Sequence, residues 1–222
     1  MTVAGSPPTR VAVTGTPGTG KTTAVERLPA VAADSRAAGL EPIHLNRLVR
    51  EGAATDRDDE RGSLVADMEA LADRLAGREG ILVESHLAHR LDADLVAVLR
   101  CHPHELTRRL RDRGEPEATV VEDARAEALD VVLAEAVDRY GRDRVYELDT
   151  TDRPPDAVAR WIAAVVAGER DPDAGTVDFS DVLPLGPGPG PGPDSGAPGA
   201  APDTNTDEEE GDGTAPGGSE GR

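Results

Sequence analysis

Residues 15–22 read Gly15-Thr16-Pro17-Gly18-Thr19-Gly20-Lys21-Thr22 and match the pattern G-x-x-x-x-G-K-[ST]. This pattern indicates a phosphate-binding loop (P-loop) only where a strand precedes it and a helix follows it. Both conditions are met here. Residues 11–14 form a short apolar run typical of a buried strand, and residues 22–28 are expected to be helical. The sequence therefore predicts a strand, a P-loop and a helix in that order.

Each residue type in the loop has a physical reason. Gly18 and Gly20 let the backbone turn its N–H groups inward around phosphate oxygens. The N-terminus of the following helix adds partial positive charge. Lys21 is expected to reach the β- and γ-phosphates, and the hydroxyl of Thr22 to ligate Mg²⁺. The loop thus predicts binding of ATP together with Mg²⁺.

The composition is strongly acidic and almost free of lysine. The chain has 43 acidic and 24 basic residues, a formal net charge of −19, and Lys21 is its only lysine. At molar ionic strength the Debye length falls to about 3 Å, which screens such self-repulsion. A halophilic source is therefore expected. A GC-rich genome is the alternative, and it explains the arginines but not the charge.

The rest of the composition indicates the compartment. Cys101 is the only cysteine, so an intramolecular disulfide is excluded and a reducing environment is expected. No stretch has the pattern of a signal peptide or of a membrane span. We expect a cytoplasmic protein with no membrane partner.

Strand-like and helix-like segments alternate through residues 9–168, which predicts an α/β protein with a doubly wound parallel sheet of five strands. The expected strands are residues 11–14, 43–45, 81–83, 95–99 and 145–148. The expected helices are residues 22–28, 64–75, 104–113, 120–140 and 155–167.

The composition changes near residue 170, which predicts a P-loop domain at 1–170 and a tail at 171–222. The tail is rich in Gly and Pro and contains 12 acidic residues against one basic residue. It has too little apolar surface to offset its ordering entropy, so disorder is expected. A short anchored piece at 177–185, which contains Phe179, is the expected exception.

An acidic residue and a histidine follow the expected strand at 81–83. After Thr22, Glu84 is expected to be the second residue that holds Mg²⁺, either directly or through water. His86 lies at the carboxyl edge of the sheet, where ligands of open α/β sheets bind. It could position an attacking water or a phosphate. The alternative for His86 is a helix cap or a surface position.

Several further segments lie at characteristic intervals over residues 9–165. They are residues 15–23, 45–46, 84–89, 99–101, 109–110, 113–114, 122–123, 126–127, 130 and 149–151. Together they resemble the archaeal and nuclear adenylate kinase family that is associated with small-subunit ribosome maturation.

This resemblance implies an adenylate-kinase type of fold, phosphoryl transfer from ATP to AMP, and an accompanying ATPase activity. It also implies an AMP-binding segment at about 44–67 and a short lid at about 112–122. By the same resemblance, Glu84 and His86 correspond to the acid-x-His element of the family. The ATP-binding residues that it implies are Gly18, Gly20, Lys21, Thr22, Thr23 and Arg113. Lys21, His86 and Arg113 are the implied catalytic residues.

The expected lid departs from the family pattern. Glu115 stands where the family usually has a tyrosine, and the lid carries no lysine. Arginines must therefore supply the positive charge: Arg113 is the first candidate, and Arg100 and Arg109 are the next. For the acceptor phosphate the candidates are Arg47, Arg50 and Arg61. Each of these arginines could instead be an ordinary surface or ion-paired residue.

Other classes of function fit less well. A GTPase would need a second lysine for its guanine motif, and the histidine pairs lack a third ligand for zinc. The chain has no basic face or aromatic platform, so sequence-specific nucleic-acid binding is not expected. Two hypotheses remain: a kinase acting on ATP and AMP, or an ATP-hydrolysing assembly factor. A basic small-subunit ribosomal protein or a pre-ribosome is the expected partner.

Overall fold

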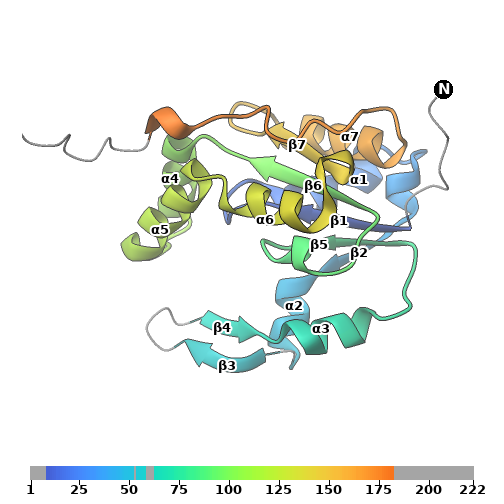
Figure 1. The fold of residues 1–222 in the computed structure, drawn as a ribbon, viewed down its shortest axis with the longest axis horizontal. Helices are drawn as coiled ribbons and strands as arrows, with labels where there is room; N and C mark the ends of the chain where they lie inside the picture. Colours follow the sequence, from blue (N-terminus) through green and yellow to red (C-terminus); the bar gives the residue numbers. More distant parts are fainter. Residues whose placement is uncertain (1–8, 53, 59–62, 183–222) are drawn as a thin grey trace, which may run out of the picture. The chain divides into compact units, whose positions relative to one another are not determined.

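The computed structural model describes residues 9–52, 54–58 and 63–182 of the chain. Five parallel strands form the central sheet in the order β2-β5-β1-β6-β7 (Figure 1). They are β1 (Arg10–Thr14), β2 (Glu41–His44), β5 (Ile81–Glu84), β6 (Leu95–Arg100) and β7 (Val145–Asp149). This sheet confirms the expected fold class.

Helices cover both faces of the sheet. The helices are α1 (Lys21–Val31), α2 (Leu45–Arg50), α3 (Met68–Leu75), α4 (Pro103–Asp112), α5 (Glu117–Ala128), α6 (Val131–Tyr140) and α7 (Pro155–Val166). None of these described helices is long and apolar enough to cross a membrane.

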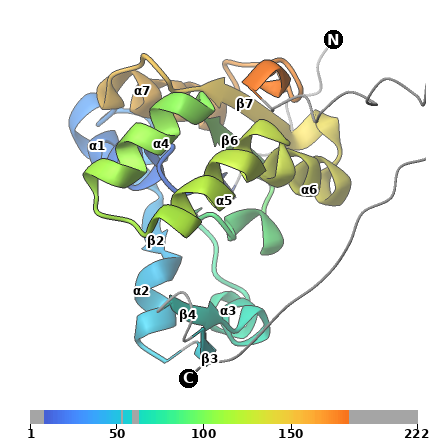
Figure 2. The ribbon, with the colours of Figure 1, turned by 90° about the vertical axis from the view of Figure 1, so that its left-hand side faces the viewer.

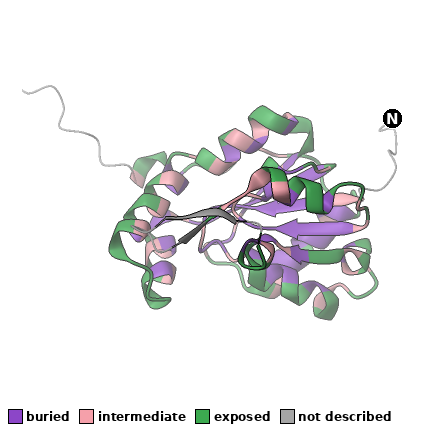
Figure 3. Ribbon diagram, turned by 90° about the horizontal axis from the view of Figure 1, so that it is seen from below, coloured by how far each residue is buried: buried purple, intermediate pink, exposed green. Residues whose placement is uncertain are grey.

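Both faces of each central strand are buried. Val11 and Val13 pack with residues of α1 and α7 in one core cluster, whereas Ala12 packs with residues of α3 and α6 in another. Successive side chains of a strand point to opposite faces, so a strand covered on both sides reads as a continuous apolar run. Figure 3 shows the buried strands between the two helical layers.

The segment at 64–75 corrects the expectation of a single helix. Ser63–Ala66 is strand β4, which pairs antiparallel with β3 (Ala54–Asp58). The helix α3 starts only at Met68, because the carboxylate of Asp67 accepts a hydrogen bond from the amide of Ala70 at 2.9 Å and caps it. Together with α2, these elements form a small lobe beside the sheet (Figure 1).

The expected helix at 120–140 is also wrong, because two helices occupy this stretch. Asp130 lies between α5 and α6 in the left-handed region, with φ 56°. Its carboxylate accepts a hydrogen bond from Arg100, which helps to hold this conformation. Helices α4 and α5 form a hairpin closed by Leu106, Leu110 and Val120 (Figure 2).

The packed part of the chain extends beyond the expected boundary at residue 170. Glu147 on β7 accepts hydrogen bonds from the amides of residues 175–177, and Phe179 is buried. The described chain ends at Val182 in a short 3₁₀ turn (Ser180–Val182). These contacts hold residues 175–179 against the domain, which includes part of the anchored piece expected at 177–185. The rest of the expected tail, from residue 183 onward, lies outside the described residues.

Candidate active site

The P-loop connects the end of β1 to the start of α1 and folds around the side chain of Lys21. The ammonium of Lys21 donates hydrogen bonds to the carbonyl oxygens of Gly15 at 2.8 Å and Thr16 at 2.9 Å. The residue is only 7% exposed. The loop carbonyls therefore hold the cation at the mouth of the helix, where the loop amides would meet an anion.

Burial changes the acidity of this ammonium. The pKa of Lys21 is lowered to about 8, chiefly because the group is removed from water; the charges of Glu84 and Glu127 oppose this shift, and the charge of Arg113 adds to it. A bound polyphosphate would favour the charged form in the same way as these carboxylates do. The site is therefore arranged to gain from an anionic ligand.

Glu84 lies at the end of β5, beside the first turn of α1. Its carboxylate accepts a hydrogen bond from the hydroxyl of Thr22 at 2.8 Å, and its other oxygen lies 2.8 Å from Nδ1 of His44. A hydroxyl and a carboxylate are the kind of oxygen donors that Mg²⁺ takes alongside water and phosphate. The donor set of Thr22 and Glu84 thus fits a nucleotide-bound Mg²⁺.

A metal site made by protein side chains alone differs from a site for nucleotide-bound Mg²⁺. Within the described ranges, no group of three or more His, Cys, Asp or Glu side chains is placed to hold a metal ion. Magnesium in phosphoryl-transfer enzymes is usually held by one or two protein oxygens together with the substrate phosphates. A nucleotide-bound Mg²⁺ would use the Thr22 and Glu84 oxygens in this manner.

His86 stands at the same edge of the sheet. Burial and, to a lesser degree, the charge of Lys21 lower the pKa of His86 to about 4. The imidazole is therefore neutral at pH 7, and its ring can accept or donate a hydrogen bond without carrying charge.

One cavity of about 690 Å³ brings the predicted site residues together. All eight candidates from the sequence line it: Gly18, Gly20, Lys21, Thr22, Thr23, Glu84, His86 and Arg113. Residues of α2 line it from the expected AMP-binding segment, namely Asn46, Val49 and Arg50. The α4–α5 hairpin lines it from the expected lid, through Arg113, Glu115, Thr119 and Asp123.

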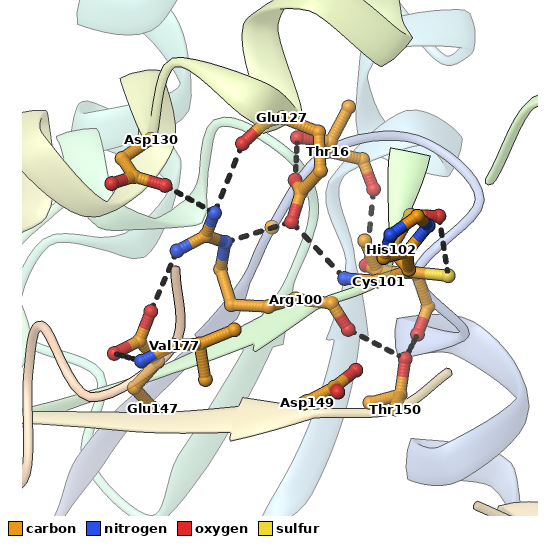
Figure 4. A network of polar contacts seen from close by, with 12 residues as sticks. Thr16, Arg100, Cys101, His102, Glu127, Asp130, Glu147, Asp149, Thr150 and Val177 are labelled. Atoms are coloured by element: carbon orange, nitrogen blue, oxygen red, sulfur yellow. Dashed lines mark hydrogen bonds and ion pairs between the residues drawn. The ribbon is translucent and has the colours of Figure 1, made fainter. Parts of the chain in front are cut away.

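Of the other arginine candidates, Arg50 lines the cavity, whereas Arg47, Arg100 and Arg109 do not. Arg100 is 1% exposed and is surrounded by carboxylates behind the P-loop, so it does not reach the cavity (Figure 4). Arg109 is bonded to Glu105 and to two backbone carbonyls. Arg47 lies 3.7 Å from Glu51 on the surface of α2. Arg61 lies outside the described residues, which leaves Arg50 and Arg113 facing the cavity.

The sequence did not reveal two groups that support the site. His44 ends β2 and is paired in register with Glu84, but this neighbourhood follows only from the order of the strands. Glu127 accepts a hydrogen bond from the hydroxyl of Thr16 in the P-loop, although the two are 111 residues apart. A glutamate at a helical position shows no local sign of such a role.

The fold and the cavity define a P-loop NTPase of the kinase class, and comparisons with known proteins agree. The family model described as "AAA domain" matches residues 11–130. "Putative adenylate kinase" from Natronomonas pharaonis is 57% identical over 175 residues, covering 78% of this chain and 99% of that protein. The protein of the same name from Halobacterium salinarum is 55% identical, with the same coverage. The chain belongs to this archaeal adenylate-kinase-type family.

A solved structure shares the fold. Shikimate kinase from Acinetobacter baumannii, in complex with shikimate, superposes with a TM-score of 0.50 and 18% identity, covering 73% of this chain and 94% of that one. The family and the fold together support a nucleotide kinase that binds ATP.

The close packing of the P-loop against β6 leads to a stability prediction. A Cβ at Gly15, where φ is +139°, would lie 2.1 Å from the carbonyl oxygen of Leu99, whereas a Cβ at Gly20, where φ is +92°, would meet nothing within 4 Å. Both substitutions by alanine carry backbone strain of about 1–3 kcal/mol. Only Gly15→Ala adds a backbone clash, so it should cost at least about 2 kcal/mol more than Gly20→Ala.

Denaturant unfolding of the two variants in the same buffer measures the difference. Equal losses of stability in Gly15→Ala and Gly20→Ala would contradict the described approach of the loop to β6.

Proposed function

We propose that the protein is an adenylate kinase that transfers the γ-phosphoryl group of ATP to AMP, producing two molecules of ADP, and that it also hydrolyses ATP. One observation carries the proposal: the P-loop and Arg50 of α2 line a single cavity. One end of this cavity suits the phosphates of ATP, and the other end suits the phosphate of a monophosphate acceptor.

The proposed roles follow from the chemistry of the lining residues. Lys21 and the loop amides hold the β- and γ-phosphates, and Thr23 continues the phosphate contacts along the first turn of α1. Arg113, at the start of the lid loop, supplies charge to the transferred group when the lid closes. Mg²⁺, held by Thr22 and by Glu84 directly or through water, would neutralise charge on the phosphates. Asn46 and Arg50 hold the acceptor.

Hydrolysis requires a water in place of the acceptor. The neutral ring of His86 lies at the cavity wall near Glu84 and Lys21, where it can orient such a water toward the γ-phosphate. This acid-x-His arrangement is the observation that favours the second candidate function. In that alternative, an ATP-driven assembly factor acts on a ribosomal protein and has little true kinase role.

The proposed setting is the cytoplasm, and the proposed client is a basic small-subunit ribosomal protein or a pre-ribosome. A net charge of −19 favours a basic partner through complementary charge. The same charge supports a salt-adapted protein, so the assays belong in molar potassium chloride as well as in low salt.

The acceptor is tested by a coupled assay of ADP production with ATP alone, with ATP plus each nucleoside monophosphate, and with ATP plus the candidate ribosomal protein. We expect AMP to raise ADP production at least about tenfold over ATP alone, because a bound and oriented acceptor reacts faster than a transient water.

Absence of AMP-dependent ADP production at both salt concentrations would remove the kinase proposal. Stimulation by the ribosomal protein alone would favour the assembly-factor alternative instead.

Substitution His86→Ala tests the role of the histidine. Loss of a group that orients the attacking water should lower ATP hydrolysis about 100-fold. The affinity for ATP should stay within about twofold, because the P-loop supplies the phosphate contacts. Hydrolysis rates and nucleotide-binding titrations measure the two effects.

His104→Ala, at an exposed position on α4, is the matched control and should change neither quantity. Collapse of ATP binding in His86→Ala would show that the role assigned to His86 is wrong.

A further inference from the structure

The carboxylate of Glu127 contacts the P-loop but does not line the cavity. One of its oxygens accepts a hydrogen bond from the hydroxyl of Thr16. The other accepts hydrogen bonds from Nε of Arg100 at 2.7 Å and from the amide of Cys101 at 3.0 Å. Glu127 is 2% exposed and belongs to α5, the helix that also carries part of the expected lid. A lid helix is thus bonded directly to the phosphate-binding loop.

Thr16 connects this carboxylate to Lys21. Its carbonyl oxygen accepts hydrogen bonds from the ammonium of Lys21 at 2.9 Å and from the hydroxyl of Thr19 at 3.0 Å. Thr16 is 2% exposed and is not among the residues that line the cavity. Its side chain therefore holds the loop from behind, while its backbone orients the catalytic lysine.

The C-terminal segment completes the arrangement (Figure 4). Arg100 donates to Glu147 at 2.6 Å, and the second oxygen of Glu147 accepts hydrogen bonds from the amides of residues 175–177 at 2.8, 2.8 and 3.3 Å. The guanidinium of Arg100 packs over the ring of Phe179, with Cζ 5.3 Å from the centroid of the ring. Residues 171–179 thus fix one side of Arg100, and Glu127 fixes the other.

We propose that Glu127 is a positioning residue that sets the geometry of the P-loop and of Lys21 through the hydroxyl of Thr16, and that Arg100, Glu147 and residues 171–179 hold Glu127 in place. The proposal rests on nucleotide binding at the P-loop and not on the identity of the phosphate acceptor.

Stability alone is a weak explanation for this cluster. Arg100 is grouped with three carboxylates, of which Glu127 and Glu147 are almost fully buried. Desolvation of such groups is expensive, and well-packed apolar residues often give equal or greater stability. A buried cluster that ends on the loop holding Lys21 gains instead by fixing geometry, because catalytic groups need placement to within a fraction of an ångström.

The test compares Thr16→Ala with Thr16→Ser in the full-length chain, using ATP titration with Mg²⁺ and thermal unfolding. Thr16→Ala removes the hydrogen bond to Glu127, whereas Thr16→Ser keeps it. A hydrogen bond to a charged group is strong enough for a change of about tenfold, so ATP should bind about tenfold more weakly to Thr16→Ala. Thr16→Ser should bind within about twofold of the wild type.

Glu127→Gln is the reciprocal variant, and its matched control is Glu41→Gln, which alters an exposed ion pair with Arg78 away from the cavity. Glu127→Gln should weaken ATP binding, and combining it with Thr16→Ala should add little, because both changes act on the same contact between Glu127 and Thr16. Phe179→Ala tests the C-terminal segment and should produce a smaller loss of affinity. Glu41→Gln should have no effect on ATP binding.

Thr16→Ala leaves Glu127 bonded to Arg100 and Cys101, so it decides the question even if Glu127→Gln fails to fold. ATP binding by Thr16→Ala at the wild-type affinity would overturn the proposal. So would an equal loss in Thr16→Ser. Because ATP binding is the readout, these results do not depend on whether AMP proves to be the acceptor.

Discussion

The ammonium of Lys21 is taken out of water and held by the carbonyl oxygens of Gly15 and Thr16, and the geometry of the site depends on this contact. A desolvated cation is expensive unless it is hydrogen-bonded and near opposite charge. The loop carbonyls, Glu84 and Glu127 meet that requirement in part, and burial still lowers the pKa of Lys21 to about 8. An anion brought to the helix N-terminus would supply the rest. The free protein is therefore arranged for a polyphosphate, which accords with its place among nucleotide kinases.

A second group of buried charges, around Arg100, supports the loop that holds Lys21. Behind the P-loop, Arg100 is bonded to Glu127 and Glu147, and Glu127 in turn is bonded to Thr16. This group joins the loop, helix α5, strand β7 and the segment after α7. The position of α5 and the placement of Lys21 are thus connected through a few hydrogen bonds. The same connection explains why the chain packs against β7 and Arg100 beyond the end of α7.

The features that the sequence predicted are those with local signals. The P-loop and the five buried strands are continuous in sequence, and parallel strands place the loop, Glu84 and His86 at one edge of the sheet. The rest depends on distant contacts. Strand β3 is mostly polar and β4 shows no alternation of apolar and polar residues. The break between α5 and α6 follows from the bond between Asp130 and Arg100. Arg100 was a candidate to meet phosphate, but it is enclosed by Glu127 and Glu147, which become its neighbours only in the fold.

The most direct test of the account is the affinity of Lys21→Arg for ATP with Mg²⁺. This change keeps the charge but replaces a compact ammonium by a planar guanidinium, which does not fit between the two carbonyl oxygens. The account predicts that ATP binds at least about tenfold more weakly, a loss of ~1.4 kcal/mol, while Arg27→Lys on the exposed side of the same helix has no effect. Binding of ATP by Lys21→Arg at the wild-type affinity would contradict it.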